Sequence, residues 1–180
     1  RLNDDGSLVL EDHSPRHLQR NVIKCNWLPD ITEEFTGYTR VLLDGCFGES
    51  DMELQNLLLE IIGVTILGVS TRMKAPKGIV FFGATASNGK STILNLIRLL
   101  LPRTATCSIP PSDFEKEQSL ATLVGKTANL TDEISNYKSI ASDKMKSLIT
   151  GDIVAAKIIY QPVFNFQPIA THIFATNELP

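Results

Sequence analysis

The sequence predicts an α/β fold: a three-layer sandwich with a mainly parallel sheet, preceded by a small, mainly helical domain. Two observations support this. From residue 76 onward, short apolar runs such as Ile-Val-Phe-Phe at 79–82 alternate with helical patterns, which is typical of a sheet buried on both faces. Before that point the patterns are mostly helical, and a polar, proline-containing stretch at 71–78 separates the two parts. We therefore expect one domain over residues 1–75 and another over 76–180.

Composition places the chain among ordinary globular proteins. It has 180 residues, of which 43% are hydrophobic and 21% charged, and a net charge of −3. Because this charge provides no general attraction for nucleic acid, any such contact must be local or created by assembly. The three cysteines are far apart and form no CxxC pair, which predicts reduced thiols, a cytoplasmic setting and no structural zinc. The chain begins at Arg1 rather than at a methionine, so we read it as a piece of a longer protein.

In the first part, residues 1–29 look irregular, apart from a short strand candidate at 7–10. Two capping-box patterns then predict two helices. The first begins at Asp30 and ends at the glycines 45 and 48, and the second begins at Ser50. The second helix contains an apolar run at 57–69 that is too short to span a bilayer, so we expect a buried helix and no membrane contact. We expect five residues on its buried face: Leu54, Leu57, Leu58, Ile61 and Ile62.

In the second part, the strand at 79–82 is followed by a loop and a helix over 91–101, which Pro102 stops. On this helix we expect Arg98 to point outward and five residues to point inward: Ile93, Leu94, Ile97, Leu100 and Leu101. Further strand candidates lie at 104–109, 127–131, 153–160, 163–166 and 170–175, and helix candidates at 119–124 and 139–150.

The loop sequence Phe-Phe-Gly-Ala-Thr-Ala-Ser-Asn-Gly-Lys-Ser-Thr at 81–92 resembles a phosphate-binding loop. That loop requires G-x-x-x-x-G-K-[ST] between a strand and a helix, so that backbone N–H groups and the helix N-terminus surround phosphate oxygens. Here Ala84 occupies the first glycine position and Gly83 lies one residue early. A coincidental turn is the alternative. We expect nine residues to bind the nucleotide: Ala84, Thr85, Ala86, Ser87, Asn88, Gly89, Lys90, Ser91 and Thr92.

Two further polar groups follow predicted strands. Asp132-Glu133 ends the strand at 127–131, and one carboxylate there can hold Mg²⁺ while the next activates water. Asn177 ends the strand at 170–175 and can lie beside a terminal phosphate. Alone, the acidic pair is a common surface feature and the asparagine a common strand terminator. Together with the loop they are stronger, because α/β sheets bind ligands at the carboxyl ends of their strands.

Four motifs together resemble the superfamily 3 helicases, within them the phage and plasmid primase–helicase group that is related to poxvirus-type helicase–primases. They are SNGKST (87–92), NLTDEIS (129–135), MKSLITGD (145–152) and FNFQPIATHIFATNELP (164–180). The resemblance implies a P-loop NTPase fold of AAA+-like type, assembly into a ring, usually a hexamer, and ATP-driven movement on DNA. It also implies a cytoplasmic protein of a bacterial host, encoded by a phage or mobile element.

Residue by residue, the resemblance implies a phosphate role for Lys90 and Mg²⁺ ligation by Ser91 and Asp132. Glu133 takes the role of general base and Asn177 that of sensor. ATP and Mg²⁺ are the expected cofactors. The ATP-hydrolysing ring of this family uses an arginine finger, which would lie beyond Pro180, so we expect the isolated chain to bind nucleotide weakly and hydrolyse it poorly.

The same resemblance predicts a hairpin over 153–166 that enters a central channel and contacts single-stranded or forked DNA. Lys157 is the candidate for phosphate contact and Tyr160 for base stacking, although an exposed lysine and a packed tyrosine are equally ordinary. Lys146 is a candidate for a contact with a neighbouring subunit's nucleotide, or a solvated helix lysine.

Two other functions remain open from the sequence. One is a different P-loop DNA machine, such as a packaging or initiator ATPase, which would lack the hairpin before the last strand. The other is a catalytically silent DNA-binding scaffold. The intact set of Lys90, Asp132 and Glu133 argues against the scaffold.

Overall fold

The computed structural model describes residues 37–48, 51–84, 88–134 and 143–178, together with positions 9, 11–12, 14–17 and 21–23. Its helices are α1 (Tyr38–Phe47), α2 (Met52–Leu67), α3 (Lys90–Leu100), α4 (Glu117–Ala121) and α5 (Asp143–Thr150). Its strands are β1 (Ile79–Phe82), β2 (Thr106–Cys107), β3 (Ala128–Thr131), β4 (Val154–Lys157), β5 (Val163–Phe166) and β6 (Thr171–Thr176). Four 3₁₀ turns, η1 to η4, lie at Pro15–His17, Ser70–Arg72, Arg103–Ala105 and Pro111–Asp113. None of the helices within these ranges is both long and apolar enough to span a bilayer.

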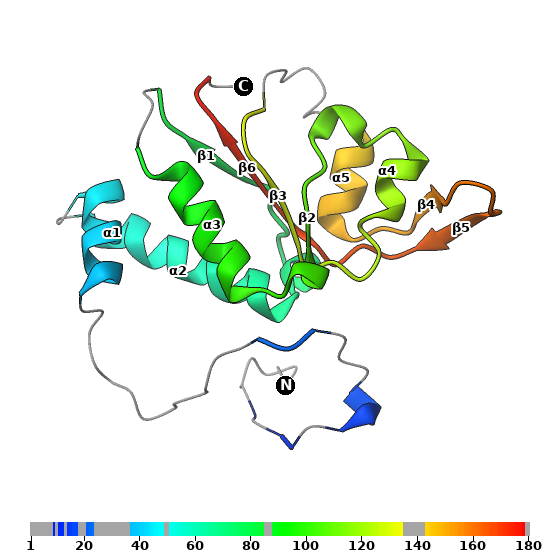
Figure 1. Ribbon diagram of the computed structural model, residues 1–180, viewed down its shortest axis with the longest axis horizontal. Helices are drawn as coiled ribbons and strands as arrows, with labels where there is room; N and C mark the ends of the chain where they lie inside the picture. The colour runs from blue at the N-terminus through cyan, green and yellow to red at the C-terminus, as the bar shows by residue number, and fades with distance from the viewer. Residues whose placement is uncertain are drawn as a thin grey trace.

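Four strands form one parallel sheet in the order β1-β6-β3-β2, and β4 pairs with β5 in a separate antiparallel ribbon. The last strand in the sequence, β6, therefore lies between β1 and β3 (Figure 1). All six of its residues are buried, as expected for a central strand covered on both faces. This confirms an α/β fold with a mainly parallel sheet.

Helices cover both faces of the sheet, which gives three layers (Figure 1). Helices α1, α2 and α3 lie on one face, where Leu43, Leu58 and Leu94 share a core with Leu130 and Ile173 of the strands. Helices α4 and α5 and the β4–β5 ribbon form a second core on the other face, which includes Phe174. Adjacent residues of β6 thus point into different cores, as the alternation of a strand requires. The division into domains at residues 75 and 76 stays a prediction.

The first two helices differ from the sequence expectation in their ends and in their buried face. Helix α1 runs through Gly45 and ends at Gly48, while Asp30 lies outside the described residues. Helix α2 is capped by Asp51, whose carboxylate accepts a hydrogen bond from the Leu54 N–H at 3.2 Å. Leu54 and Leu57, which we expected to be buried, are about half exposed.

A buried glutamine explains why α2 buries a different face from the one we expected. The Gln55 side-chain amide donates to the Asp44 carboxylate at 3.1 Å and to the Gly48 carbonyl at 2.9 Å. These bonds provide donors for the Asp44 carboxylate and the Gly48 carbonyl at the end of α1. They therefore hold the face of α2 that carries Gln55, Leu58 and Ile62 toward the core. Because α2 is apolar on most sides, its hydrophobic period alone does not decide which face is buried.

Strand β2 has two residues rather than the six expected at 104–109. Pro110 and Pro111 follow and have no N–H groups to continue a ladder. The Asn129 side chain instead binds the chain at Ile109, accepting from its N–H at 2.7 Å and donating to its carbonyl at 2.9 Å. The other predicted elements of the second part are present. Strands β1 and β5 have the expected bounds, α5 ends at Thr150 as expected, and α3, α4, β3, β4 and β6 differ by one to three residues at one or both ends. The strand candidate at 7–10 lies mostly, and residues 139–142 lie wholly, outside the described residues.

The same asparagine orients a buried histidine of β6. Its amide nitrogen lies 3.2 Å from His172 Nδ1, so Nδ1 accepts and the proton of the neutral ring is on Nε2. His172 is fully buried between Phe114 and Phe174, with ring centroids 5.3 and 6.2 Å away. Burial lowers the pKa of His172 from 6.5 to about 4, since a charged ring is not solvated there.

This burial predicts an acid-sensitive fold. Because the folded pKa lies below the unfolded one, the unfolded state takes up the proton first, and stability falls as the pH drops from 7 to 4. The expected loss from this residue is about 3 kcal/mol. Urea unfolding of the wild type and of His172→Leu at pH 7, 5.5 and 4 measures it. The free energy of unfolding of the wild type should fall more steeply toward low pH than that of His172→Leu, and parallel pH profiles would contradict the assignment.

Candidate functional site

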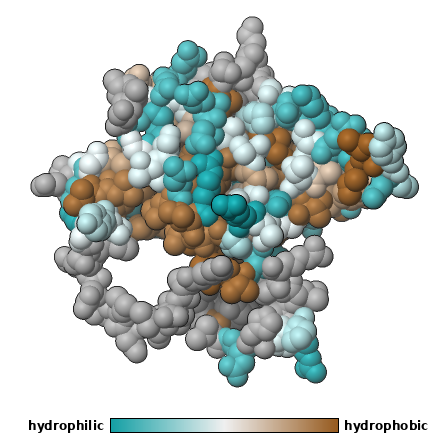
Figure 2. Space-filling model, in the orientation of Figure 1, coloured by the Kyte–Doolittle hydropathy of each residue, from teal (hydrophilic) through white to brown (hydrophobic). Residues whose placement is uncertain are grey.

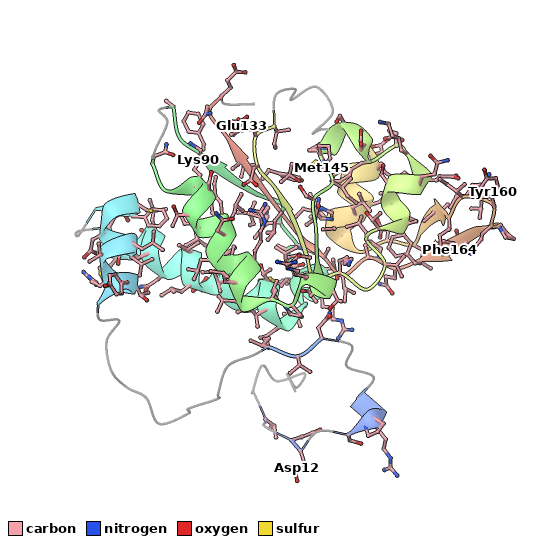
Figure 3. All side chains as sticks on the ribbon, in the orientation of Figure 1. Asp12, Lys90, Glu133, Met145, Tyr160 and Phe164 are labelled. Atoms are coloured by element: carbon pink, nitrogen blue, oxygen red, sulfur yellow. The ribbon has the colours of Figure 1, made fainter. Side chains whose placement is uncertain are left out.

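Three strand ends meet at one edge of the sheet. Strands β1, β3 and β6 are parallel neighbours, with Phe82 opposite Thr176 and Thr131 opposite Phe174. The residues that follow them are Gly83, Asp132 and Asn177. Figure 3 shows Lys90 and Glu133 near this same edge, at the top of the view. The topology therefore brings together three polar segments that are far apart in the sequence.

Lys90 connects two of these segments. Its Nζ donates to the Gly83 carbonyl at 3.1 Å, to the Asn88 amide oxygen at 2.6 Å and to the Asn177 amide oxygen at 2.9 Å. The ammonium group thus lies inside the loop and against the end of β6. All three of these acceptors are neutral oxygens.

Gly83 follows β1 and lies against the Asn88 side chain. Its N–H donates to the Thr176 carbonyl at 3.2 Å, which extends the ladder between β1 and β6 by one residue. A side chain at this position would overlap the Asn88 amide and contact the Lys90 ammonium group. Ala84, which occupies the first glycine position of the motif, is exposed. The absence of a side chain at Gly83 thus leaves room for the Asn88 amide beside Lys90.

Gly89 is required for two separate reasons. It begins α3 in the left-handed conformation, with φ of 82°, and a side chain there would overlap the Cys46 thiol of α1. Helix α3 therefore begins directly at Lys90, and its positive N-terminal end faces the loop. Ser91 and Thr92 are exposed in its first turn, whereas residues 85–87 (Thr85, Ala86 and Ser87) lie outside the described residues.

The acidic pair lies where the chain leaves β3. Asp132 Oδ2 accepts from Arg98 Nη2 of α3 at 2.7 Å, and Glu133 is exposed. Glu133 adopts a φ of 52°, which costs a non-glycine residue about 1–2 kcal/mol. Such strain is concentrated at functional sites, and here it turns the chain between two adjacent carboxylates. Sequence reasoning placed Arg98 outward and missed its contact with Asp132.

The oxygen atoms of the side chains at this edge suit Mg²⁺ better than a metal ion whose ligands all come from protein side chains. The Ser91 hydroxyl and the Asp132 carboxylate are hard oxygen ligands, and Mg²⁺ takes most of its other ligands from phosphates and water. Within the described residues, no three His, Cys, Asp or Glu side chains are grouped to hold a metal ion.

A shallow cavity of about 370 Å³ lies beside the loop. One wall is the loop end, Asn88 and Gly89, and the other is α1. The residues of α1 that line it are Tyr38, Val41, Leu42, Gly45 and Cys46. The Tyr38 side chain is 95% exposed. Burial raises the pKa of the Cys46 thiol, so it stays protonated and serves as an apolar wall.

The β4–β5 hairpin lies far from the loop (Figure 3). Its strands pair Lys157 with Val163, and the turn between them is closed by a Gln161 N–H to Ile158 carbonyl bond of 3.0 Å. Lys157 and Tyr160 are both exposed, and Tyr160 has a φ of 64° at the tip. Figure 2 shows apolar surface at this end, to which Ile158, Ile159 and Val163 contribute. Lys146 is exposed on α5.

Comparison with known proteins gives a family and a fold. The profile of a family described as "Family of unknown function (DUF5906)" matches residues 81–180. No curated protein matches the sequence. Apo structures of the C-terminal region of NrS-1 superpose with TM-scores of 0.61, 0.56 and 0.55, at 16%, 14% and 13% identity. The first two align over 81% of this chain, and the third over 76%.

At these identities the similarity shows the fold alone. The chain spans about a third of the structures that it matches, with 35%, 33% and 31% of their lengths covered.

The loop geometry predicts different effects for two neighbouring substitutions. If the loop binds a nucleoside triphosphate, Gly83→Ala should force the Asn88 side chain out of its place, distort the loop and weaken that binding by about tenfold. Ala84→Gly restores the motif at an exposed position and should leave the affinity within about twofold of the wild type. Titration with a fluorescent ATP analogue measures both, and equal losses would contradict a special role for Gly83.

Proposed function

Because this chain belongs to the family of unknown function DUF5906, whose description states no activity, we propose a function from the site itself. We propose that the chain is a P-loop NTPase domain of AAA+-like type that binds ATP and Mg²⁺. It works as the helicase motor of a primase–helicase in the replication of a phage, plasmid or prophage, where it translocates on DNA and unwinds it.

One observation carries this proposal: Lys90 Nζ lies 2.9 Å from Asn177 Oδ1 and 3.1 Å from the Gly83 carbonyl. A lysine with a coincidental Gly-Lys-Ser sequence has no reason to meet the tip of a strand 87 positions later. A phosphate-binding lysine does, because the terminal phosphate must lie between the loop and the groups that position water. The order β1-β6-β3 provides this arrangement by placing Asn177 between the loop and the acidic pair.

The residues divide the chemistry among them. The N–H groups of the loop and the N-terminus of α3 hold the phosphates, and Lys90 exchanges its neutral acceptors for phosphate oxygens. Ser91 and Asp132 would hold Mg²⁺, which supplies charge neutralisation when bound. Glu133 accepts the proton of the attacking water, and Asn177 orients that water. The strained turn at Glu133 supports this role, since it places the second carboxylate outside the strand.

The cavity between α1 and the loop suits the base of the nucleotide. It begins at Asn88 and Gly89, where the phosphates end, and is lined largely by apolar groups and one exposed aromatic ring, Tyr38. Such walls favour a stacked aromatic base.

The DNA-binding part of the proposal rests on the hairpin. A packaging or initiator ATPase was expected to lack a hairpin before the last strand, and the β4–β5 hairpin directly precedes β6. Its tip presents Tyr160 and Lys157, a stacking group and a cation, to solvent. Assembly into a ring, with six subunits and with Lys146 near a neighbour's nucleotide, is part of this proposal.

DNA-stimulated ATP hydrolysis tests the motor. In the full-length protein, Lys90→Ala should lower stimulated hydrolysis by about a hundredfold or more, because it removes the main charge at the phosphates. Lys77→Ala, an exposed lysine just before β1, is the matched control and should keep it. Strand displacement should follow the same pattern. No hydrolysis by an assembled wild-type ring would favour the scaffold function instead.

Substitution at the hairpin separates DNA contact from hydrolysis. Tyr160→Ala should weaken single-stranded DNA binding by about tenfold, which is the effect of losing one stacked base, and leave hydrolysis without DNA unchanged. Tyr160→Phe keeps the ring and should bind DNA as the wild type does. Fluorescence anisotropy with a labelled oligonucleotide gives the affinities. If Tyr160→Phe binds as weakly as Tyr160→Ala, the tip does not act by stacking.

A further inference from the structure

Arg98 holds three groups at the carboxyl end of the sheet. Its guanidinium donates to Asp132 Oδ2 at 2.7 Å, to the Leu130 carbonyl at 3.2 Å and to the Asn95 amide oxygen at 3.0 Å. Two of these groups belong to β3 or its end, and the third is one turn earlier on α3. The planar guanidinium is therefore fixed in position and in orientation.

This contact links the two halves of the proposed site through rigid elements. Helix α3 carries Lys90 at its first residue and Arg98 in its last turn. Strand β3 ends one residue before Asp132. Because Arg98 ties the helix to the strand end, it fixes where the carboxylate stands relative to the loop.

The contact engages only one carboxylate oxygen. Arg98 binds Oδ2, and within the residues that the structure describes no contact engages Oδ1 of Asp132. The pair is also partly exposed, with 31% of the Arg98 side chain and 47% of the Asp132 side chain accessible. Ion pairs in such surroundings contribute little to stability, so the fold alone does not account for this arrangement.

We infer that Arg98 is a positioning residue for the divalent cation of the nucleotide. It holds Oδ2 of Asp132 and leaves Oδ1 to bind Mg²⁺ or a water of its shell. This inference rests on the proposed function. The opposite possibility is a latch, in which the guanidinium and the cation compete for one carboxylate. The two differ in sign, because removing a positioning residue weakens cation binding and removing a competitor strengthens it.

The test measures cation binding rather than turnover. A fluorescent ATP analogue is titrated into the full-length protein with EDTA and then with rising Mg²⁺. Arg98→Ala should leave the affinity without Mg²⁺ unchanged and weaken the apparent Mg²⁺ affinity of the complex by about tenfold or more, as the loss of an outer-shell group does. Arg98→Lys keeps the charge without the planar fork and should restore part of it. Arg103→Ala, a nearby arginine in η3, is the control.

A double-mutant cycle with Asp132→Asn isolates the mechanism. If Arg98 acts through Asp132, adding Arg98→Ala to Asp132→Asn should cause little further loss. Additive losses, unchanged Mg²⁺ affinity or tighter Mg²⁺ binding in Arg98→Ala would each overturn the inference. If circular dichroism shows that Arg98→Ala does not fold, the Mg²⁺ affinity of Arg98→Lys is used instead. Weaker Mg²⁺ binding in that variant supports the inference, and equal or tighter binding overturns it. Wild type that binds no nucleotide, or binds it equally after Lys90→Ala, would instead overturn the proposed function.

Discussion

The hydrogen bond between Lys90 and Asn177 depends on the position of β6, and most of the site depends on that strand as well. All residues of β6 are buried, with parallel neighbours on both sides. Because its register with β1 and β3 is set by these ladders, the ends of three strands are held at one edge. A shift of register by one residue would exchange the faces of His172 and Ile173 between the two cores. Packing of the core thus fixes the positions of Gly83, Asp132 and Asn177, which lie outside it at the ends of the strands.

The loop between β1 and α3 departs from the usual phosphate-binding sequence at its first glycine. Its glycine lies at 83 rather than 84, yet Gly83 both extends the ladder toward Thr176 and leaves room for the Asn88 side chain. The hydrogen bond from Lys90 Nζ to the Asn88 amide oxygen is the shortest of those described for Lys90, at 2.6 Å. Packing of Cys46 against Gly89 places α1 beside the loop. The helices before the sheet are therefore part of the surroundings of the site.

Much of this architecture is predictable from the sequence, because apolar runs that end in polar residues mark buried parallel strands and their carboxyl ends. The runs before Gly83 and Asn177 are of this kind, whereas the strand before Asp132 is less apolar and contains Asn129. What the sequence does not contain is the order of the strands, since parallel neighbours are joined by long crossovers and their adjacency is decided by packing over the whole chain. The contact between Lys90 and Asn177 depends on that order.

Other differences have local reasons. Arg98 reads as solvent-facing because it lies off the apolar stripe of α3, but the end of β3 covers that side of the helix. The apolar run of α2 gives no preferred face, and a single buried amide, Gln55, decides it. Asn129 is an unusual residue for a strand interior, and its purpose becomes visible only when Ile109 lies beside it. In each case the contact that decides the local structure involves a residue distant in the sequence or a buried polar side chain, and hydrophobic periodicity reports neither.

The proposed function requires that the loop, the acidic pair and the tip of β6 form one nucleotide site. An NMR titration of the ¹⁵N-labelled protein with ATP and Mg²⁺ tests it most directly. If the three segments form one site, the amide signals of Gly83, Gly89 and Asn177 should shift together and saturate at one nucleotide concentration. Those of Asp132 and Glu133 should follow when Mg²⁺ is added. Signals of the hairpin around Tyr160 should stay in place. Shifts confined to one of the three segments, or none at saturating nucleotide, would contradict it.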